Sequence, residues 1–358
     1  MKKSFLLFAL LCSLSLSAMG QKLRYVDAIE LGIHGHTKQT DKSPYYRYDH
    51  TPYAGFNKTI ISHSKKSTGL YITFKTNSSQ IWATWENTPR RVGDNMTGIV
   101  QLGLDLYIKQ DGEWKFAAVG RVSTLPEKNK RTKQIIKNLP EGEKECLLYL
   151  PIWCELRELH IGIDEGATIE GLPQPFRHKV IVHGSSITHG ASASRAGLTY
   201  TALLSRNLGI DFVNFGFSGE CKMQPQFLEF LKTCEADAFL FDAFSNPNAK
   251  EIGERLVGFV EELVKAHPGK PLIFLQSPIL ETLDTKKYER LSSRIELSRK
   301  MMKELSKKYK DVYYLEVENV TGENGLIDGS HPTDLGFHRF VEAYQPKIAK
   351  ILKKYGIK

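Results

Sequence analysis

Apolar and polar residues follow two different patterns along the chain, and the change comes near Pro173 and Pro175. Before it, short segments rich in β-branched and aromatic residues, such as GLYITFKT, QIWATWE and CLLYLPIW, alternate with turns rich in Gly, Asn, Asp and Pro. Such segments are typical of strands, and the Asp-Gly pair in QDGEW favours a tight hairpin. Residues 21–172 are therefore predicted to form an all-β sandwich, which ends at a linker, GLPQPFRHK.

From Lys179 onward, apolar strands alternate with helical patterns. The expected strands are KVIV, IDFVNF, DAFLFDAF, KPLIFLQ and VYYLEV, and amphipathic stretches such as AKEIGERLVGFVEELVKAHPG lie between them. Strands that are apolar throughout and joined by helices are typical of a parallel sheet with helices on both faces. Residues 173–358 are therefore predicted to form an α/β domain around five parallel strands.

Polar residues suited to acyl transfer follow these strands, at the carboxyl edge where parallel sheets place their active sites. Ser186 follows the first strand, Gly219 the second and Asn246 the third, while Asp328 and His331 follow the last. A serine hydroxyl needs a base that takes its proton during attack and returns it to the leaving group, and histidine suits this exchange. Asp328, three residues before His331, would hold the imidazole in the required tautomer. The sequence therefore predicts a triad of Ser186, His331 and Asp328.

The negative charge that develops on the carbonyl oxygen in such a reaction needs preorganised hydrogen-bond donors. The backbone N–H groups of Ser186 and Gly219 and the side-chain amide of Asn246 are the candidates. Asn248 competes with Asn246, which is preferred because it comes sooner after the strand. Asn248 lies beyond Pro247, where it is suited to cap the next helix.

These segments resemble the sequence blocks of the SGNH, or GDSL-type, hydrolases. GSSITHG looks like the first block, with Ser186 in the nucleophile position and Ser185 where the family commonly has Asp. NFGFSG resembles the second block, which places Gly219 as an oxyanion donor, and DGSHP at residues 328–332 matches the last block. GLDLY, at residues 103–107, is similar to the motif of an N-terminal β-domain in one secreted branch of the family.

The resemblance implies a flavodoxin-like, three-layer α/β domain with a five-stranded parallel sheet, preceded by the β-sandwich. It also implies a secreted serine esterase that removes acetyl or other short acyl groups from a polysaccharide or oligosaccharide, with no cofactor and no metal ion. A lipase, a lysophospholipase or a thioesterase would use the same residues. A glycan-binding protein without catalytic activity is the alternative from another class, and the complete set of candidate residues favours an enzyme.

The first 20 residues have two lysines, an apolar segment and small residues at Ala18 and Gly20, a pattern typical of a cleaved secretory signal. We therefore expect a mature chain that starts near Gln21 and is secreted or periplasmic. No later apolar run is long enough to span a bilayer, so stable membrane insertion is not expected. The formal net charge is +9, but no aromatic residues interleave with the main basic cluster at Lys128 to Lys137. A nucleic acid partner is therefore not expected.

Four cysteines follow this segment, at positions 146, 154, 221 and 234. In an oxidising compartment an even number allows disulfides, and the spacing allows Cys146 with Cys154 and Cys221 with Cys234. Four buried thiols in a large folded chain are the open alternative. The spacing does not indicate a metal site, because no CxxC pair is present.

Overall fold

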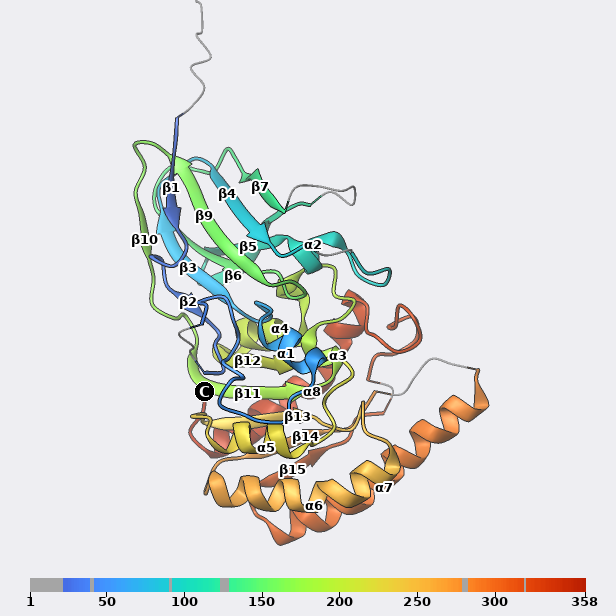
Figure 1. Ribbon diagram of the computed structural model, residues 1–358. Coiled ribbons are helices and arrows are strands. Elements are labelled where there is room, and N and C mark those ends of the chain that lie inside the picture. The colour runs from blue at the N-terminus through green and yellow to red at the C-terminus, as the bar shows by residue number, and fades with distance from the viewer. Residues whose placement is uncertain (1–21, 39–41, 90–91, 123–128, 279–282, 319) are drawn as a thin grey trace, which may run out of the picture.

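The computed structural model describes residues 22–358 except 39–41, 90–91, 123–128, 279–282 and 319. The predicted secretory signal, residues 1–20, lies outside the described residues. The described chain forms two antiparallel sheets in its first half and one parallel sheet covered by helices in its second half (Figure 1). Within these described ranges, no helix has the length and apolar character needed to cross a membrane.

The first half forms a sandwich. Its strands are β1 (Leu23–Asp27), β2 (Ile33–His34), β3 (Tyr71–Thr76), β4 (Ile81–Asn87), β5 (Leu104–Gln110), β6 (Glu113–Gly120), β7 (Lys130–Ile136), β8 (Lys144–Tyr149), β9 (Leu156–Asp164) and β10 (Ile169–Gly171). One sheet has the order β1-β9-β4-β7, and the other has the order β10-β3-β8-β5-β6 with β2 paired to β3. Phe74 and Leu106 from one sheet meet Trp85 and Ile161 from the other in a single apolar core. The predicted all-β sandwich is confirmed.

Two short helices, α1 (Lys58–Ser64) and α2 (Gly98–Leu102), interrupt this otherwise all-β half. The side chain of Asn57 accepts the N–H of Ile60 at 2.9 Å, and the hydroxyl of Thr97 accepts the N–H of Val100 at 3.1 Å. Such capping satisfies backbone donors at the start of a helix. The strand pattern alone did not predict these helices.

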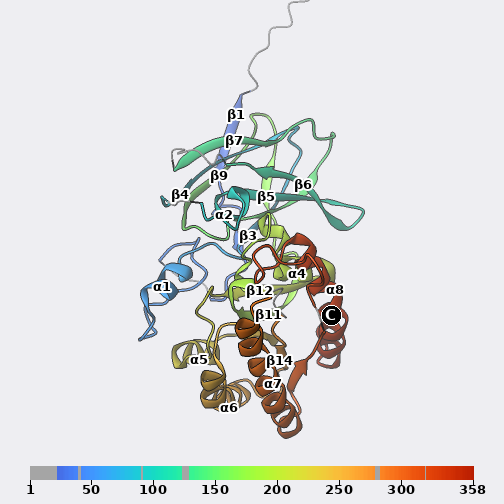
Figure 2. The same ribbon diagram turned by 90° about the vertical axis from the view of Figure 1, so that its right-hand side faces the viewer.

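A segment of the first half packs against the second half. The ring of Tyr48 lies 5.1 Å from that of Phe215 and 4.7 Å from that of Phe230, and Ile60 belongs to the same apolar cluster. The buried guanidinium of Arg47 donates to the carbonyl oxygen of Gly216 at 2.8 Å. Figure 2 shows α1 below the sandwich, at the level of the parallel sheet. The segment around α1 therefore completes the core of the α/β half, and the predicted division after residue 172 stays a prediction.

The second half contains five parallel strands, as predicted. They are β11 (Arg177–Gly184), β12 (Ile210–Gly216), β13 (Ala238–Asp242), β14 (Leu272–Leu275) and β15 (Val312–Leu315). Their order in the sheet is β12-β11-β13-β14-β15, and every neighbouring pair is parallel. This is the flavodoxin-like order, in which the chain leaves the first strand toward one edge and then crosses to the other. The predicted fold class is confirmed.

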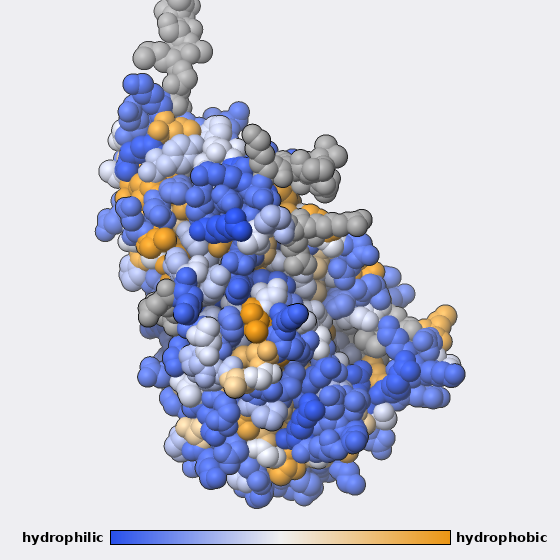
Figure 3. Space-filling model, in the orientation of Figure 1, coloured by the Kyte–Doolittle hydropathy of each residue, from blue (hydrophilic) through white to orange (hydrophobic). Residues whose placement is uncertain are grey.

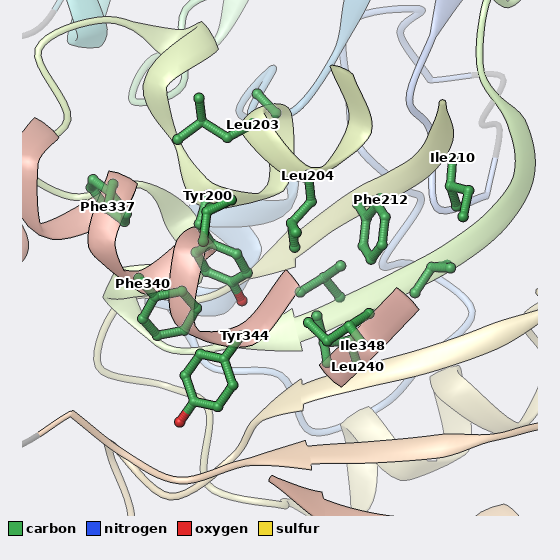
Figure 4. Close-up of a cluster of buried hydrophobic side chains, with 14 of the residues drawn as sticks. Tyr200, Leu203, Leu204, Ile210, Phe212, Leu240, Phe337, Phe340, Tyr344 and Ile348 are labelled. Carbon is green, nitrogen blue, oxygen red and sulfur yellow. The ribbon is translucent and has the colours of Figure 1, made fainter. Parts of the chain in front are cut away.

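Helices cover both faces of this sheet. They are α3 (Ser186–His189), α4 (Tyr200–Leu208), α5 (Pro225–Lys232), α6 (Ala249–Ala266), α7 (Thr285–Lys308) and α8 (Asp334–Lys354), with a short 3₁₀ turn at Ala196–Leu198. On one face, Tyr200 of α4 and Phe340 of α8 pack with Phe212 and Leu240 of the strands (Figure 4). Residues of α5, α6 and α7 pack on the other face. The surface in Figure 3 is mostly hydrophilic, with small separate apolar patches.

Candidate active site

The chain turns sharply between β11 and α3, at the carboxyl edge of the parallel sheet. β11 ends at Gly184 and α3 begins at Ser186, so Ser185 is the helix cap and its hydroxyl accepts the N–H of Ile187 at 3.1 Å. A Cβ atom at Gly184 would lie 1.9 Å from Oγ1 of Thr188, so only glycine fits this turn. The turn leaves Ser186 at the sheet edge with 9% of its surface exposed.

His331 lies between Ser186 and Asp328. Its Nε2 is 2.9 Å from Oγ of Ser186, and its Nδ1 is 2.7 Å from Oδ2 of Asp328. The other carboxylate oxygen of Asp328 accepts the N–H groups of Ser330 at 3.0 Å and of His331 at 2.8 Å. The structure therefore brings together the three residues that the sequence predicts as a triad.

The pKa of Asp328 is lowered to about 2. Partial burial acts in the opposite direction, but hydrogen bonds from Asn95 and His331 to the carboxylate outweigh it. An ionised carboxylate can only accept hydrogen bonds, so Nδ1 of His331 carries the proton that lies between the two side chains. Nε2 is then free to accept the proton of Ser186, as a general base must.

Ser186 and His331 line a cavity of about 240 Å³. The remaining lining comes from Ser185, Ile187, Ser245, Asn246, Ser277, Pro278, Leu291, Arg294 and Ser330. The cavity therefore collects side chains from the segments after β11, β13 and β14, from α7 and from the turn before α8. Ligands of open α/β sheets bind at this edge.

Asn246 and Asn248 have different surroundings. Asn246 lines the cavity, and its Oδ1 accepts the N–H of Cys221 at 3.2 Å, which leaves the Nδ2 group available to a ligand. Asn248 instead caps α6: its side chain accepts the N–H of Glu251, and the Glu251 carboxylate accepts the N–H of Asn248, both at 2.9 Å. The structure thus places the preferred asparagine beside Ser186 and its competitor in a capping box.

Arg294 of α7 holds the loop that carries Asn246. Its guanidinium donates to the carbonyl oxygens of Ser245 at 3.0 Å and of Pro247 at 3.2 Å, one on each side of Asn246. The sequence analysis did not identify this residue, because nothing in a helical pattern shows which loop its cation will meet. The contact restricts the movement of the loop.

Gly219 lies in an exposed turn just after β12, with φ of +75°. It is not among the described residues that line the cavity. Its predicted role as an oxyanion donor therefore stays a prediction.

The sequence profile of the GDSL-like lipase/acylhydrolase family matches residues 177–349, and that of the N-terminus of SGNH-hydrolase-type esterases matches residues 23–169. A solved structure from Bacteroides ovatus, described as a GDSL-like lipase, is 41% identical, and the match covers 93% of this chain and 98% of that one with a TM-score of 0.88. The chain belongs to the GDSL-like lipase/acylhydrolase family. This confirms the resemblance seen in the sequence blocks and supports an esterase.

This GDSL-like hydrolase also shares its fold with more distant proteins. A salicylyl-acyltransferase from a tetracycline biosynthetic pathway is 21% identical, with coverage of 92% and 97% and a TM-score of 0.67. A family two carbohydrate esterase from Cellvibrio japonicus is 12% identical, with coverage of 93% and 98% and a TM-score of 0.59. No curated protein matches the chain. At these identities the two structures show a common fold alone.

A buried carboxylate, Asp242, lies beside the nucleophile turn of this hydrolase. One oxygen accepts the N–H of Ser185 at 3.1 Å and the hydroxyls of Ser185 at 2.5 Å and Thr188 at 3.2 Å, and the other accepts the hydroxyl of Ser245 at 2.6 Å. Burial raises the pKa of Asp242, although these hydrogen bonds favour the charged form. The sequence analysis missed this residue. The available signal was an acidic side chain at the end of the strand DAFLFDAF.

The four cysteines are buried thiols, so the two disulfides that the spacing allows do not form. Three of the thiols pack in separate surroundings: Cys146 in the sandwich core, Cys221 against His183 at 3.5 Å, and Cys234 in the core beneath the parallel sheet. Burial raises the pKa of the Cys146 thiol to about 12. A thiol in such surroundings is a weak nucleophile at neutral pH.

Proposed function

We propose that this hydrolase removes acetyl or other short acyl groups from an acylated polysaccharide or oligosaccharide, with Ser186, His331 and Asp328 as its catalytic triad. The observation that carries the proposal is the position of His331, whose ring nitrogens contact the serine hydroxyl at 2.9 Å and the carboxylate at 2.7 Å. A serine nucleophile needs a base within hydrogen-bond reach and a third group that orients the base.

The first half-reaction transfers the acyl group to the enzyme. Oγ of Ser186 attacks the carbonyl carbon while its proton passes to Nε2 of His331, and Asp328 stabilises the imidazolium. The carbonyl oxygen becomes negative and accepts hydrogen bonds from the N–H of Ser186, the N–H of Gly219 and Nδ2 of Asn246. The bond to the sugar oxygen then breaks, and the imidazolium gives its proton to that oxygen.

The second half-reaction releases the acyl group. A water molecule gives a proton to the neutral imidazole of His331 and attacks the carbonyl carbon of the acyl-enzyme. The same donors stabilise the second oxyanion. The bond to Oγ of Ser186 breaks, the imidazolium returns its proton to Oγ, and the carboxylic acid leaves as acetate and a proton.

The cavity supports a short acyl group. Its volume is about 240 Å³, and polar residues make up much of its lining, with Ile187, Pro278 and Leu291 as the main apolar contributors. A long acyl chain needs a longer apolar wall than these side chains supply. The carbohydrate esterases that share the fold, and the secretory pattern of residues 1–20, support a polymeric glycan substrate and a secreted or periplasmic location.

The test is hydrolysis by the purified chain. We expect acetate release from at least one of acetylated xylan, mannan, pectin and peptidoglycan, and a higher kcat/KM for a chromogenic acetyl ester than for the octanoyl ester. Ser186→Ala should abolish both activities. Ser293→Ala, on the exposed side of α7, is the matched control and should keep them.

Two outcomes would contradict the proposal. Preference for octanoyl over acetyl esters would favour a lipase. Hydrolysis that survives in Ser186→Ala would assign the chemistry to another residue.

A further inference from the structure

A loop of the β-sandwich reaches the triad. Asn95 lies between β4 and α2, and its Nδ2 donates to Oδ2 of Asp328 at 3.0 Å across 233 residues of sequence. Figure 1 shows α2 at the edge of the sandwich that faces the α/β half. The catalytic carboxylate therefore has a partner from the other half of the molecule.

The loop that carries Asn95 is held on both sides. The buried side chain of Gln101 accepts the N–H of Gly93 at 2.9 Å and donates to the carbonyl oxygen of Met96 at 3.1 Å. The hydroxyl of Thr97 donates to the carbonyl oxygen of Ser194, in the α/β half. These contacts hold the chain on both sides of Asn95, so the residue that donates to Asp328 is anchored in the structure.

Asn95 completes the hydrogen bonding of the Asp328 carboxylate. A carboxylate offers about four acceptor positions. Oδ1 uses two of them for the N–H groups of Ser330 and His331, and Oδ2 uses a third for Nδ1 of His331. Asn95 takes the fourth, and among the described residues it is the only donor from outside the turn 328–331. The turn fixes one oxygen, whereas Asn95 and the imidazole together fix the other.

We propose that Asn95 is a positioning residue for the triad, so that the β-sandwich takes part in catalysis by orienting Asp328. This inference rests on the proposed function. The hydrogen bond from Asn95 keeps the carboxylate ionised and its plane fixed, and both conditions hold the proton on Nδ1 of His331. The group acts through Asp328 and does not touch the substrate.

Other charged groups surround the triad. Lys287 lies with Nζ 3.4 Å from Oγ of Ser330, Arg294 lines the cavity, and Asp334 at the start of α8 accepts the N–H of Ser194 at 2.8 Å. Asp94 is exposed beside Asn95. None of these groups changes in variants of Asn95, so a change in the pH profile reports the substituted side chain.

The test compares Asn95→Ala, Asn95→Asp and the control Asn77→Ala. Asn77 is an exposed asparagine of the same sandwich, and its side chain accepts the N–H of Thr168, also in the sandwich, at 2.8 Å. For Asn95→Ala we expect kcat to fall roughly twofold to tenfold with KM unchanged, the effect of one ordinary hydrogen bond. The loss stays small because the Asp328 side chain is 34% exposed and water can take the vacant position.

Asn95→Asp keeps the size of the side chain but adds a negative charge beside Asp328. Negative charge favours the imidazolium, so the acid-side midpoint of the kcat/KM profile should move upward by roughly half a pH unit. Asn77→Ala should leave both kcat and this midpoint unchanged. A role in folding alone would lower the melting temperature of Asn95→Ala and leave the kcat of the folded variant unchanged.

The inference is wrong if Asn95→Ala keeps the wild-type kcat or if Asn95→Asp keeps the wild-type midpoint. If the alanine variant does not fold, the kcat of Asn95→Asp decides the matter, because an ionised aspartate also lacks the donor to Asp328. Wild type and Ser186→Ala are assayed beside these variants. A wild type without ester hydrolysis would refute the proposed function, whereas an active wild type with unaffected Asn95 variants would refute only the role of Asn95.

Discussion

The side-chain amide of Asn246 accepts one hydrogen bond and is proposed to donate another, and an aspartate separates the two roles. Oδ1 accepts the N–H of Cys221 at 3.2 Å, so Nδ2 is the group available to the oxyanion. Asn246→Asp keeps an acceptor for Cys221 but replaces the donor by an oxygen. We therefore expect a melting temperature close to that of the wild type. The loss of one oxyanion donor lowers kcat by about 10²-fold to 10³-fold, equivalent to about 2.7–4 kcal/mol of transition-state stabilisation.

Asn248→Ala is the matched control from the same loop. Asn248 is the cap of α6, and its capping box with Glu251 contains two hydrogen bonds of 2.9 Å. Losing such a cap lowers the free energy of unfolding by about 1 kcal/mol. Asn248 does not line the described cavity, so kcat should not change while the melting temperature falls.

Steady-state kinetics with a chromogenic acetyl ester and thermal melts of both variants check this pair of expectations. The reasoning is refuted if Asn248→Ala loses kcat by a factor of this size while Asn246→Asp keeps it. The oxyanion role would then belong to Asn248, and position in the cavity lining would be a poor guide to function.

Two further predictions concern the nucleophile turn and pH. Ser185→Ala should keep measurable hydrolysis, because its hydroxyl is engaged by Asp242 and by the cap of α3, but it should melt at a lower temperature. Rates and melts check this, and an inactive Ser185→Ala beside an active Ser186→Ala would reverse the assignment. On acidification, kcat/KM should fall reversibly, because an imidazolium cannot accept the proton of Ser186. The pKa of Asp328 is lowered to about 2. The hydrogen bonds to its carboxylate therefore stabilise the fold fully at pH values above the ordinary pKa of a carboxyl group. This contribution is lost as the pH falls toward about 2. Rates and circular dichroism between about pH 4 and 8 test this, and a rate that stays flat to about pH 4 would exclude a histidine base.

Much of the fold follows from the apolar pattern because parallel strands are buried on both faces. Runs such as KVIV and DAFLFDAF do not alternate between apolar and polar residues, and they form parts of β11 and β13. The strand order within the sheet came only with the family resemblance, since an apolar run does not specify its neighbour. The short helices α1 and α2 were missed because their evidence is a single capping side chain before each.

The triad was predictable because each of its members follows a strand end or belongs to a compact motif. Asp328 and His331 are three residues apart, and Ser186 follows the first strand of the sheet. The supporting residues lack such a signal. Asn95 meets Asp328 across 233 residues, and Arg294 meets the Asn246 loop from a helix. These contacts depend on how separate elements pack against each other, and the residue pattern within one element does not predict that packing.

Asp242 contacts Ser185, which stands where the family commonly has an aspartate. This carboxylate, at the end of β13, accepts both the N–H and the hydroxyl of Ser185. The same carboxylate accepts the hydroxyl of Ser245, the residue before Asn246. A buried charge is costly unless hydrogen bonds satisfy it, so movement of the Ser186 turn away from the Asn246 loop would remove part of the hydrogen bonding of Asp242. One buried group therefore holds the nucleophile and the proposed oxyanion donor at a fixed separation, which is the condition for donors to stabilise a transition state without rearranging.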